Sequence, residues 1–251
     1  MTKFLFITDL DNTLVGDDAA LKTLNYHLEQ HRQAYGTLIV YATGRSPELY
    51  QELKTEKPFL LTPDALLLSV GTEIYHHGQD DLDPDWVAEL SHGWDRDQVA
   101  AIAAHFADLV PQSPQEQTPF KASYHLSQEV APMVLPQLEA SLQKQGLDIQ
   151  LIYSSGKDLD ILPSRGNKGA AIAFLQQTWR LPGDRLVVCG DSGNDISMFA
   201  AATGKGIIVG NAQPELREWH HANPSPHRYV SKAHCAGGIL EGLRHFGFLE
   251  A

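Results

Sequence analysis

Short, unbroken apolar runs recur along the chain, and each ends at a polar residue or at a glycine. The runs occupy residues 4–7, 38–42, 66–70, 186–189 and 206–209. An apolar run that does not alternate with polar residues is typical of a strand buried on both faces, as in a parallel sheet. This feature restricts the fold strongly, because neighbouring parallel strands need long connections that cover the sheet.

Segments with a helical pattern separate these runs, at residues 19–35, 47–54, 167–179 and 195–202. The alternation of strand and helix predicts an α/β fold with a doubly wound, mostly parallel sheet. Ligands of such sheets bind at the carboxyl ends of the strands. The polar residues that follow the apolar runs are therefore expected to converge on one site.

The stretch from residue 78 to 159 has a different pattern. Apolar and polar side chains alternate over residues 120–126, which predicts a half-buried antiparallel strand with Lys121, Ser123 and His125 on its polar face. A second strand is expected at residues 148–153, and helices are expected at 94–109 and 128–146. We therefore predict a core of residues 1–77 and 160–251 with an inserted α+β cap of residues 78–159.

The composition is that of an ordinary globular protein, since 43% of the 251 residues are hydrophobic and 20% are charged. The formal net charge of −12, without any basic block, argues against nucleic acid or a membrane surface as a partner. The first apolar run stops at Asp9, and no run reaches the about 18 residues of a membrane helix. Because the only cysteines are Cys189 and Cys235, we expect no disulfide framework and a cytoplasmic location.

Two carboxylates follow the first apolar run, in Asp9-Leu10-Asp11. Residues two apart in an extended strand share a face, so these side chains are expected to lie together. Paired carboxylates attract a divalent cation, most simply Mg²⁺, and one of them can then act as a nucleophile while the other transfers protons. A single aspartate here would more often cap a helix or form an Asx-turn. The pair at the end of a buried strand favours the catalytic interpretation.

Two further motifs carry groups that could hold a phosphate. Thr43-Gly44-Arg45 offers a hydroxyl and backbone donors at a helix start, although such a sequence is more often a plain helix cap. Lys168, in Asn167-Lys168-Gly169, could hold a phosphate as a point charge, although any one lysine is more often a solvated surface residue.

A fourth motif follows the apolar run at residues 186–189. The turn Gly190-Asp191-Ser192-Gly193-Asn194-Asp195 supplies two carboxylates and an amide directly after a buried strand. Oxygen ligands of this kind suit a metal site. The alternative is an acidic loop that has no role in binding a metal.

In their order along the chain, the four motifs resemble the signature of the haloacid dehalogenase-like phosphatases. The resemblance implies that Asp9 is the nucleophile that becomes an aspartyl-phosphate. It implies that Asp11 is the general acid for the leaving alcohol and then the base for the hydrolytic water, with its backbone carbonyl on Mg²⁺. The inserted segment resembles the α+β cap of this superfamily.

The same resemblance implies roles for the other motif residues. Asp191 would be a metal ligand, and Asp195 would be a direct or outer partner of the metal. The groups implied to hold the phosphate are Thr43, Gly44, Lys168 and Asn194. Mg²⁺ and Lys168 would offset the repulsion between the Asp9 carboxylate and the incoming phosphoryl group.

A closer resemblance, to the sucrose-6-phosphate phosphatases, lies in residues 69–75, 120–126, 154–163 and 210–216. It implies hydrolysis of sucrose-6-phosphate in the last step of sucrose synthesis. The residues expected to contact the sugar are Arg45, Lys121, Ser123, His125, Ser155, Lys157 and Asp158. Without the resemblance, the polar cap residues would be interpreted as an open sheet face that meets water.

Several functions remain open from the sequence. Related phosphatases act on mannosyl- or glucosyl-phosphoglycerate or on phosphoglycolate, and Lys121 and Lys157 could anchor a substrate carboxylate. A sugar phosphotransferase or mutase would return the phosphoryl group to a sugar, and a regulatory subunit would catalyse nothing. We expect a monomer that binds a sugar phosphate and that could associate with a sucrose-phosphate synthase. The cap is expected to close about hinges near residues 77–78 and 160–163.

Overall fold

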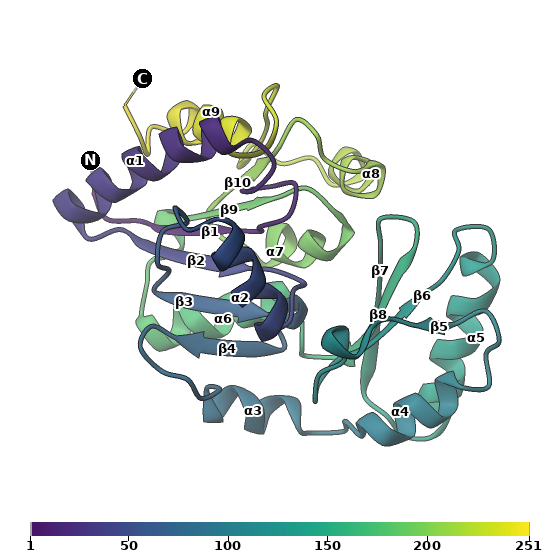
Figure 1. The fold of residues 1–251 in the computed structure, drawn as a ribbon. Coiled ribbons are helices and arrows are strands. Elements are labelled where there is room, and N and C mark those ends of the chain that lie inside the picture. Colours follow the sequence, from purple (N-terminus) through teal and green to yellow (C-terminus); the bar gives the residue numbers. More distant parts are fainter. Residues whose placement is uncertain (1, 251) are drawn as a thin grey trace.

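The computed structural model describes residues 2–250, and a seven-stranded sheet forms its larger part (Figure 1). Neighbouring strands are parallel except β3 and β4, which are antiparallel. In spatial order the strands are β11 (Arg228–Val230), β10 (Lys205–Ile208), β9 (Leu186–Gly190), β1 (Leu5–Thr8), β2 (Leu38–Ala42), β3 (Ala65–Leu68) and β4 (Glu73–His76). Each of the five apolar runs is a strand of this sheet, so the predicted fold class is confirmed.

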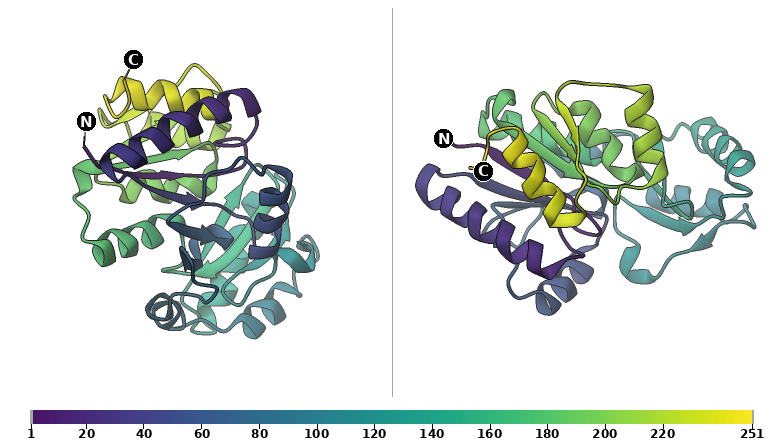
Figure 2. Two further views of the ribbon diagram at one scale, coloured as in Figure 1. Left: turned by 60° about the vertical axis from the view of Figure 1, so that its left-hand side comes forward. Right: turned by 90° about the horizontal axis from the view of Figure 1, so that it is seen from above.

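Helices cover both faces of the sheet. One face carries α1 (Asp18–Tyr35), α2 (Pro47–Glu56) and α9 (Cys235–His245). The other carries α3 (Pro84–Leu90), α6 (Lys168–Trp179), α7 (Ile196–Ala201) and α8 (Pro214–Ala222). Figure 2 shows α1 and α9 side by side over the sheet. We call the sheet and these helices the core.

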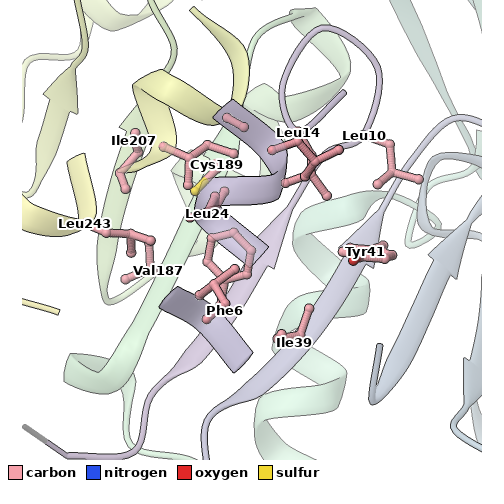
Figure 3. Packing of buried hydrophobic residues seen from close by; sticks show 14 of the residues in the cluster. Phe6, Leu10, Leu14, Leu24, Ile39, Tyr41, Val187, Cys189, Ile207 and Leu243 are labelled. Carbon is pink, nitrogen blue, oxygen red and sulfur yellow. The ribbon is translucent and has the colours of Figure 1, made fainter. Parts of the chain in front are cut away.

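The core is held together by apolar side chains that leave each strand in both directions. In β1, Phe6 packs toward α1 and α9, whereas Leu5 and Ile7 pack on the opposite face. Figure 3 shows Phe6 among Ile39, Val187 and other side chains of the first face. Burying a side chain of this size contributes about 1.5–3 kcal/mol. Burial on both faces is the reason that these strands lack polar alternation.

A second, antiparallel sheet forms the part that we call the cap. Its strands, in spatial order, are β5 (Val110–Pro111), β6 (Ala122–His125), β8 (Asp158–Pro163) and β7 (Ile149–Ser154). The helices α4 (Arg96–Ala103) and α5 (Ala131–Lys144) pack on it around a separate apolar cluster. The 3-10 turns are η1 (Ser69–Gly71), η2 (Pro114–Glu116), η3 (Gly183–Arg185) and η4 (Gly193–Asp195).

The limits of the cap differ from the expected segment at both ends. The strand β8 runs across the predicted boundary at residues 159/160 and stays in the cap sheet up to Pro163. At the other end, α3 lies within the predicted cap segment, yet Trp86 and Leu90 pack into the core. None of the described helices is long and apolar enough to cross a membrane.

The order of the strands places one crevice at the centre of the core. The neighbours of β1 are β2 on one side and β9 on the other. The chain therefore leaves β1 toward one edge of the sheet and later returns to build the other edge. This switch in direction leaves a crevice beyond the carboxyl end of β1, where α/β sheets bind ligands. The cap lies beyond this edge of the sheet (Figure 1).

Candidate active site

A cavity of about 360 Å³ lies between the core and the cap, at the carboxyl ends of β1, β2 and β9. Most of the predicted site residues line it: Asp9, Asp11, Thr43, Gly44, Arg45, Lys121, His125, Ser155, Lys157, Asp158, Asp191 and Asn194. The other three, Ser123, Lys168 and Asp195, are fully buried around it. The structure thus brings residues from both halves of the core and from the cap to one place.

Three buried carboxylates meet at the floor of the cavity. Each of Asp9, Asp191 and Asp195 offers an oxygen within 4.8 Å of those of the other two. Thr13 donates from its hydroxyl to Asp191 at 3.0 Å, and the backbone N–H groups of Asp191 and Ser192 donate to Asp195. The trio therefore has a fixed geometry, and its oxygen donors fit a divalent cation.

Lys168 joins two members of the trio. Its ammonium donates to Asp9 and to Asp195, both at 2.7 Å, and none of its surface is exposed. The lysine reaches this point because Asn167 caps α6 and Lys168 is the first residue of the helix. A fully buried ammonium needs such partners, since burying an unpaired charge is costly. Lys168 is therefore part of the site and not a solvated surface lysine.

Burial changes the protonation of these groups. Burial raises the pKa of Asp9 to about 7, although Lys168 opposes the rise. Burial and the neighbouring Asp195 raise the pKa of Asp191 to about 8. Burial alone would lower the pKa of Lys168, but Asp195 and Asp9 together raise it above its usual value. Adjacent carboxylates repel each other when both are ionised, so they hold protons near neutral pH when no cation offsets their charge. This behaviour is expected of a cation site that contains no cation.

Asp11 lies outside the trio, and its side chain turns toward Arg45. The guanidinium of Arg45 donates to both carboxylate oxygens of Asp11 at 2.8 Å, through Nε and Nη2. Asp9 and Asp11 both line the cavity, as their spacing in the sequence predicted. Arg45, expected on the sugar, pairs here with Asp11, and a fork of two bonds fixes the plane of the carboxyl group.

The loop at Thr43 is held from behind by η1. The backbone N–H of Val70 donates to the carbonyl of Thr43 at 3.0 Å, and that of Ser69 donates to the carbonyl of Arg45 at 2.9 Å. The amide Nδ2 of Asn194 lies near Gly44, 3.8 Å from where a Cβ on that glycine would be. The two segments expected to hold phosphate therefore face each other across the cavity.

The structure corrects the sequence analysis at the polar face of the cap strand β6. Lys121 and Ser123 were expected on a half-exposed face, but only 1% and 0% of their surfaces are accessible. Residues 112–118 fold over this face, and Lys121 reaches the core to donate to the carbonyl of Gly44 at 3.1 Å. His125 alone stays exposed. The segment that covers a strand face is remote in sequence, so alternation could not predict this burial.

Sequence reasoning missed several polar groups of the cap wall. Asp160 accepts from Ser123 at 2.6 Å, Glu116 accepts from Lys121 at 3.0 Å, and Gln112 donates to Asp158 at 3.2 Å. All three missed residues line the cavity. Carboxylates and amides on a rigid wall suit the recognition of hydroxyl groups. Glu116 and Gln112 belong to none of the motifs. Asp160 lies in residues 154–163, a segment that was used only for its resemblance to the sucrose-6-phosphate phosphatases.

A second bridge joins the cap to the core at the β7–β8 turn. The backbone N–H of Ser155 donates to the carboxylate of Glu215 at 2.9 Å, and the backbone N–H of Gly193 approaches the same oxygen at 3.3 Å. Ser155, which donates across this bridge, has a positive φ of 56°. With the Lys121 contact, this bridge closes the cavity on two sides.

Comparisons with known proteins show the family to which this chain belongs. The family model of sucrose-6F-phosphate phosphohydrolases matches residues 2–247. A sucrose-phosphatase of Synechocystis, solved in complex with sucrose and phosphate, has 44% identity and a TM-score of 0.91, over 100% of both chains. A probable sucrose-phosphatase of Arabidopsis thaliana is 40% identical over 97% of this chain and 60% of its own length. A mannosylfructose-phosphate phosphatase of Agrobacterium fabrum is 36% identical over 97% and 96%.

The present chain thus spans about 60% of the length of its plant relatives. Solved structures with the haloacid dehalogenase-like fold cover nearly the whole chain, which confirms the fold that the motifs predicted. The match to the family model is almost as long as the chain itself. This protein belongs to the sucrose-6F-phosphate phosphohydrolase family, within the haloacid dehalogenase-like fold.

Proposed function

We propose that this chain is a Mg²⁺-dependent phosphatase that hydrolyses sucrose-6F-phosphate to sucrose and phosphate. The observation that carries the proposal is the buried arrangement of Asp9, Lys168 and Asp195 on the floor of a cavity roofed by a polar cap wall. The floor suits a phosphoryl group and a cation, and the wall suits a sugar. Membership of the family supports sucrose-6F-phosphate as the substrate.

The chemistry follows from the roles of the chain's own side chains. Asp9 attacks phosphorus, the bond to the sugar oxygen breaks, and Asp11 gives a proton to that oxygen. Asp11 then takes a proton from water, which attacks the aspartyl-phosphate and releases phosphate with a regenerated Asp9. Lys168 and Thr43 hold the phosphoryl oxygens, whose charge would otherwise repel the nucleophile.

The trio of carboxylates is proposed to hold the Mg²⁺ ion. Asp9 and Asp191 would supply carboxylate ligands, Asp195 would bind directly or from behind, and the backbone carbonyl of Asp11 would complete the set. The bound cation would neutralise charge on the transferring oxygens. The fit rests on three buried carboxylates whose charges are offset by only one lysine in the described residues.

A second substrate is favoured by one comparison. The mannosylfructose-phosphate phosphatase matches this chain over nearly the full length of both proteins. Sucrose and mannosylfructose differ in the hexose attached to fructose, so the cap wall must discriminate between two hexoses. Discrimination of this kind depends on hydrogen bonds to individual hydroxyl groups. We place sucrose-6F-phosphate first because it gives the family its description.

Phosphate release from a panel of esters tests the proposal. The panel contains sucrose-6F-phosphate, mannosylfructose-phosphate, mannosyl-phosphoglycerate, phosphoglycolate, glucose-6-phosphate and fructose-6-phosphate, each with Mg²⁺ and with EDTA. We expect fast Mg²⁺-dependent release from sucrose-6F-phosphate. Preference for another ester would support the proposed phosphatase chemistry but assign a different substrate. No release by folded protein would favour a phosphotransferase or a non-catalytic role.

The remaining expectations stay predictions. They are a cytoplasmic location, a monomeric state, association with a sucrose-phosphate synthase, and no binding of nucleic acid. The division into a core of residues 1–77 and 160–251 and a cap of residues 78–159 is likewise proposed, with the structural differences described above. Contacts of the cap residues with the sugar are part of the same proposal.

A further inference from the structure

The loop that carries the predicted phosphate-site residue Asn194 is packed between the cap and the start of α8. Gly193, the first residue of η4, lies so close to both that a Cβ on it would be 3.1 Å from the carbonyl oxygen of Tyr153 in β7. The same Cβ would be 3.1 Å from Cγ of Glu215 in α8. Both distances are shorter than an ordinary van der Waals contact, so a cap strand and a core helix meet directly at this loop.

One carboxylate oxygen of Glu215 accepts hydrogen bonds from both partners of this contact. Its Oε1 accepts from the backbone N–H of Ser155 in the cap at 2.9 Å and from that of Gly193 in the core at 3.3 Å. Hydrogen bonds to an ionised carboxylate are roughly twice as strong as those between neutral groups. Glu215 therefore joins the cap to the core through backbone atoms of both.

The core side of this connection is held by other contacts as well. The backbone N–H of Gln213, just before α8, donates to the carbonyl of Asp191 at 2.7 Å. Within the loop, the side chains of Ser192 and Asp195 cap η4 through reciprocal hydrogen bonds with the backbone. We therefore expect the loop to keep its shape when the longer of the two bonds to the carboxylate, at 3.3 Å, is lost.

The cap side of the connection is a tight turn. Ser155 and Gly156 both have positive φ, of 56° and 64°, and the backbone N–H of Lys157 donates to the carbonyl of Ser154 at 3.2 Å. Ser154, Ser155 and Lys157 line the cavity, so the place of the turn decides where these groups stand. Within residues 2–250, the bond from Ser155 to Glu215 is the one hydrogen bond that joins this turn to the core.

We propose that Glu215 is a positioning residue that holds the cap turn of residues 154–157 at a fixed place beside the phosphate site. A sugar phosphate must contact the cavity floor with its phosphoryl group and the cap with its sugar at the same time. The gain from two linked contacts depends on the spacing between them. Glu215 sets this spacing from α8, although it is not among the residues that line the cavity. The inference rests on the proposed function, because it assigns the turn to the sugar.

Replacement of Glu215 by alanine removes the acceptor and tests the proposal. We expect the KM for sucrose-6F-phosphate and the inhibition constant of sucrose to rise about tenfold, the order expected for one hydrogen bond to a charged group. We expect kcat and the inhibition constant of inorganic phosphate to stay within about twofold, because the core loop keeps its shape. Glu218→Ala removes a carboxylate from an exposed position of the same helix, and this matched control should change none of these values.

Glu215→Gln asks whether the hydrogen bonds carry the effect. Glutamine keeps an acceptor oxygen without the charge, so its KM should stay within about threefold of that of the wild type. A glutamine variant as weak as the alanine variant overturns the proposal. So do equal rises in the inhibition constants of sucrose and of phosphate, which a general loosening of the site would cause. If Glu215→Ala does not fold, Glu215→Asp, with its shorter reach, must show the same split between sucrose and phosphate.

Hydrogen exchange without substrate gives a readout that does not depend on activity. The amide of Ser155 should exchange about tenfold faster in Glu215→Ala, whereas amides of β8 that pair within the cap sheet should stay protected. Unchanged exchange at Ser155 overturns the proposal. If the wild-type protein releases no phosphate from sucrose-6F-phosphate, the proposed function is wrong, and the role of the turn in sugar binding falls with it. If the wild-type protein is active and Glu215→Ala leaves its KM unchanged, only the role of Glu215 is wrong.

Discussion

We propose that the carboxylate of Asp9 is both nucleophile and metal ligand, so the replacement of Asp9 is the most direct test of the chemistry. Asp9→Asn keeps the size of the side chain and a partner for Lys168, but it removes the attacking oxygen anion. We expect phosphatase activity to fall by about three orders of magnitude or more. The measurement is phosphate release at saturating Mg²⁺.

The control for this variant is Asp97→Asn, a similar change at an exposed position of the cap helix α4. It should leave activity within about twofold, as surface substitutions usually do. Thermal unfolding of both variants confirms that they are folded. Substantial activity in Asp9→Asn would assign the nucleophile to another group.

Proton binding at the trio makes metal affinity depend on pH. With the pKa of Asp9 near about 7 and that of Asp191 near about 8, the metal-free site holds protons at neutral pH. A cation must displace them, so Mg²⁺ should bind more tightly as pH rises from 6 to 8, with the gain approaching about tenfold per pH unit for each proton released. Calorimetry in two buffers of different ionisation enthalpy measures the release. An affinity that does not change with pH would contradict the raised pKa values.

The same carboxylates affect stability, with a sign that follows from the direction of their shifts. Unfolded aspartate titrates near about 4. Because the folded pKa values of Asp9 and Asp191 are higher, their contribution to stability is present below pH 4 and is lost as pH rises through 7 to 8. The melting temperature of the metal-free protein should therefore fall as pH rises over this range. Mg²⁺ should restore it, because a cation bound to the folded state alone stabilises that state.

At the scale of elements, the η1 turn allows a matched pair of substitutions. Gly71 and Gly78 both have a positive φ, of 92° and 76°. A Cβ at Gly71 would meet the backbone of Asn167 and Lys168 at 2.7 Å, whereas a Cβ at Gly78 would meet nothing within 4 Å. Each alanine costs about 1–2 kcal/mol for the backbone conformation alone. The difference in stability loss between the two variants measures the cost of the close approach at Gly71.

We expect Gly71→Ala to displace the first residues of α6 and with them the ammonium of Lys168. Its activity should fall at least about tenfold, since small misplacements of reacting groups are costly. Gly78→Ala should lose stability only. Kinetics and thermal unfolding of both variants provide the test. Equal activity of the two proteins would show that α6 adjusts to the added methyl group.

The sequence predicted the central elements well because their residues are buried on both faces. The strand at residues 5–8 and the helix at 168–179 each match an unbroken pattern, and the motif residues Asp9 and Lys168 lie at their ends. Prediction failed at elements that lack such a pattern. The strand β4 was missed because Glu73-Ile74-Tyr75-His76 mixes polar and apolar residues at the sheet edge. The helix expected at 94–109 covers only Arg96–Ala103.

The candidate site shows the same division. The residues on the core were found because each follows a strand, and strand ends converge in a parallel sheet. The surroundings of the cap residues depend on how the cap packs on the core. Neither the burial of Lys121 nor the pairing of Arg45 with Asp11 is encoded in neighbouring residues.

At the scale of the whole molecule, the cavity between core and cap has polar bridges on two sides. The bridges run from Lys121 to Gly44 and from Ser155 to Glu215. These two bridges hold the cap against the core in the described arrangement. We expect the cap to open about the chain segments near residues 77–78 and 160–163.

Small-angle scattering tests this movement on the intact protein. The radius of gyration in Mg²⁺ alone should exceed that in Mg²⁺ with sucrose and phosphate, because closure brings the cap sheet toward the core. Glucose with phosphate is the control ligand, since it lacks half of the disaccharide. Identical curves with and without the ligands would show a cap fixed in one position.

The order of the strands also bears on how the protein is synthesised. Asp9 emerges from the ribosome long before its partner Lys168, which follows 159 residues later. The strand β1 gains its second neighbour only when β9 has emerged. The cap is nearly continuous in sequence and can fold earlier, since domains fold as units during synthesis. The cap can therefore fold before the residues of the candidate site come together, which happens only after β9 has emerged.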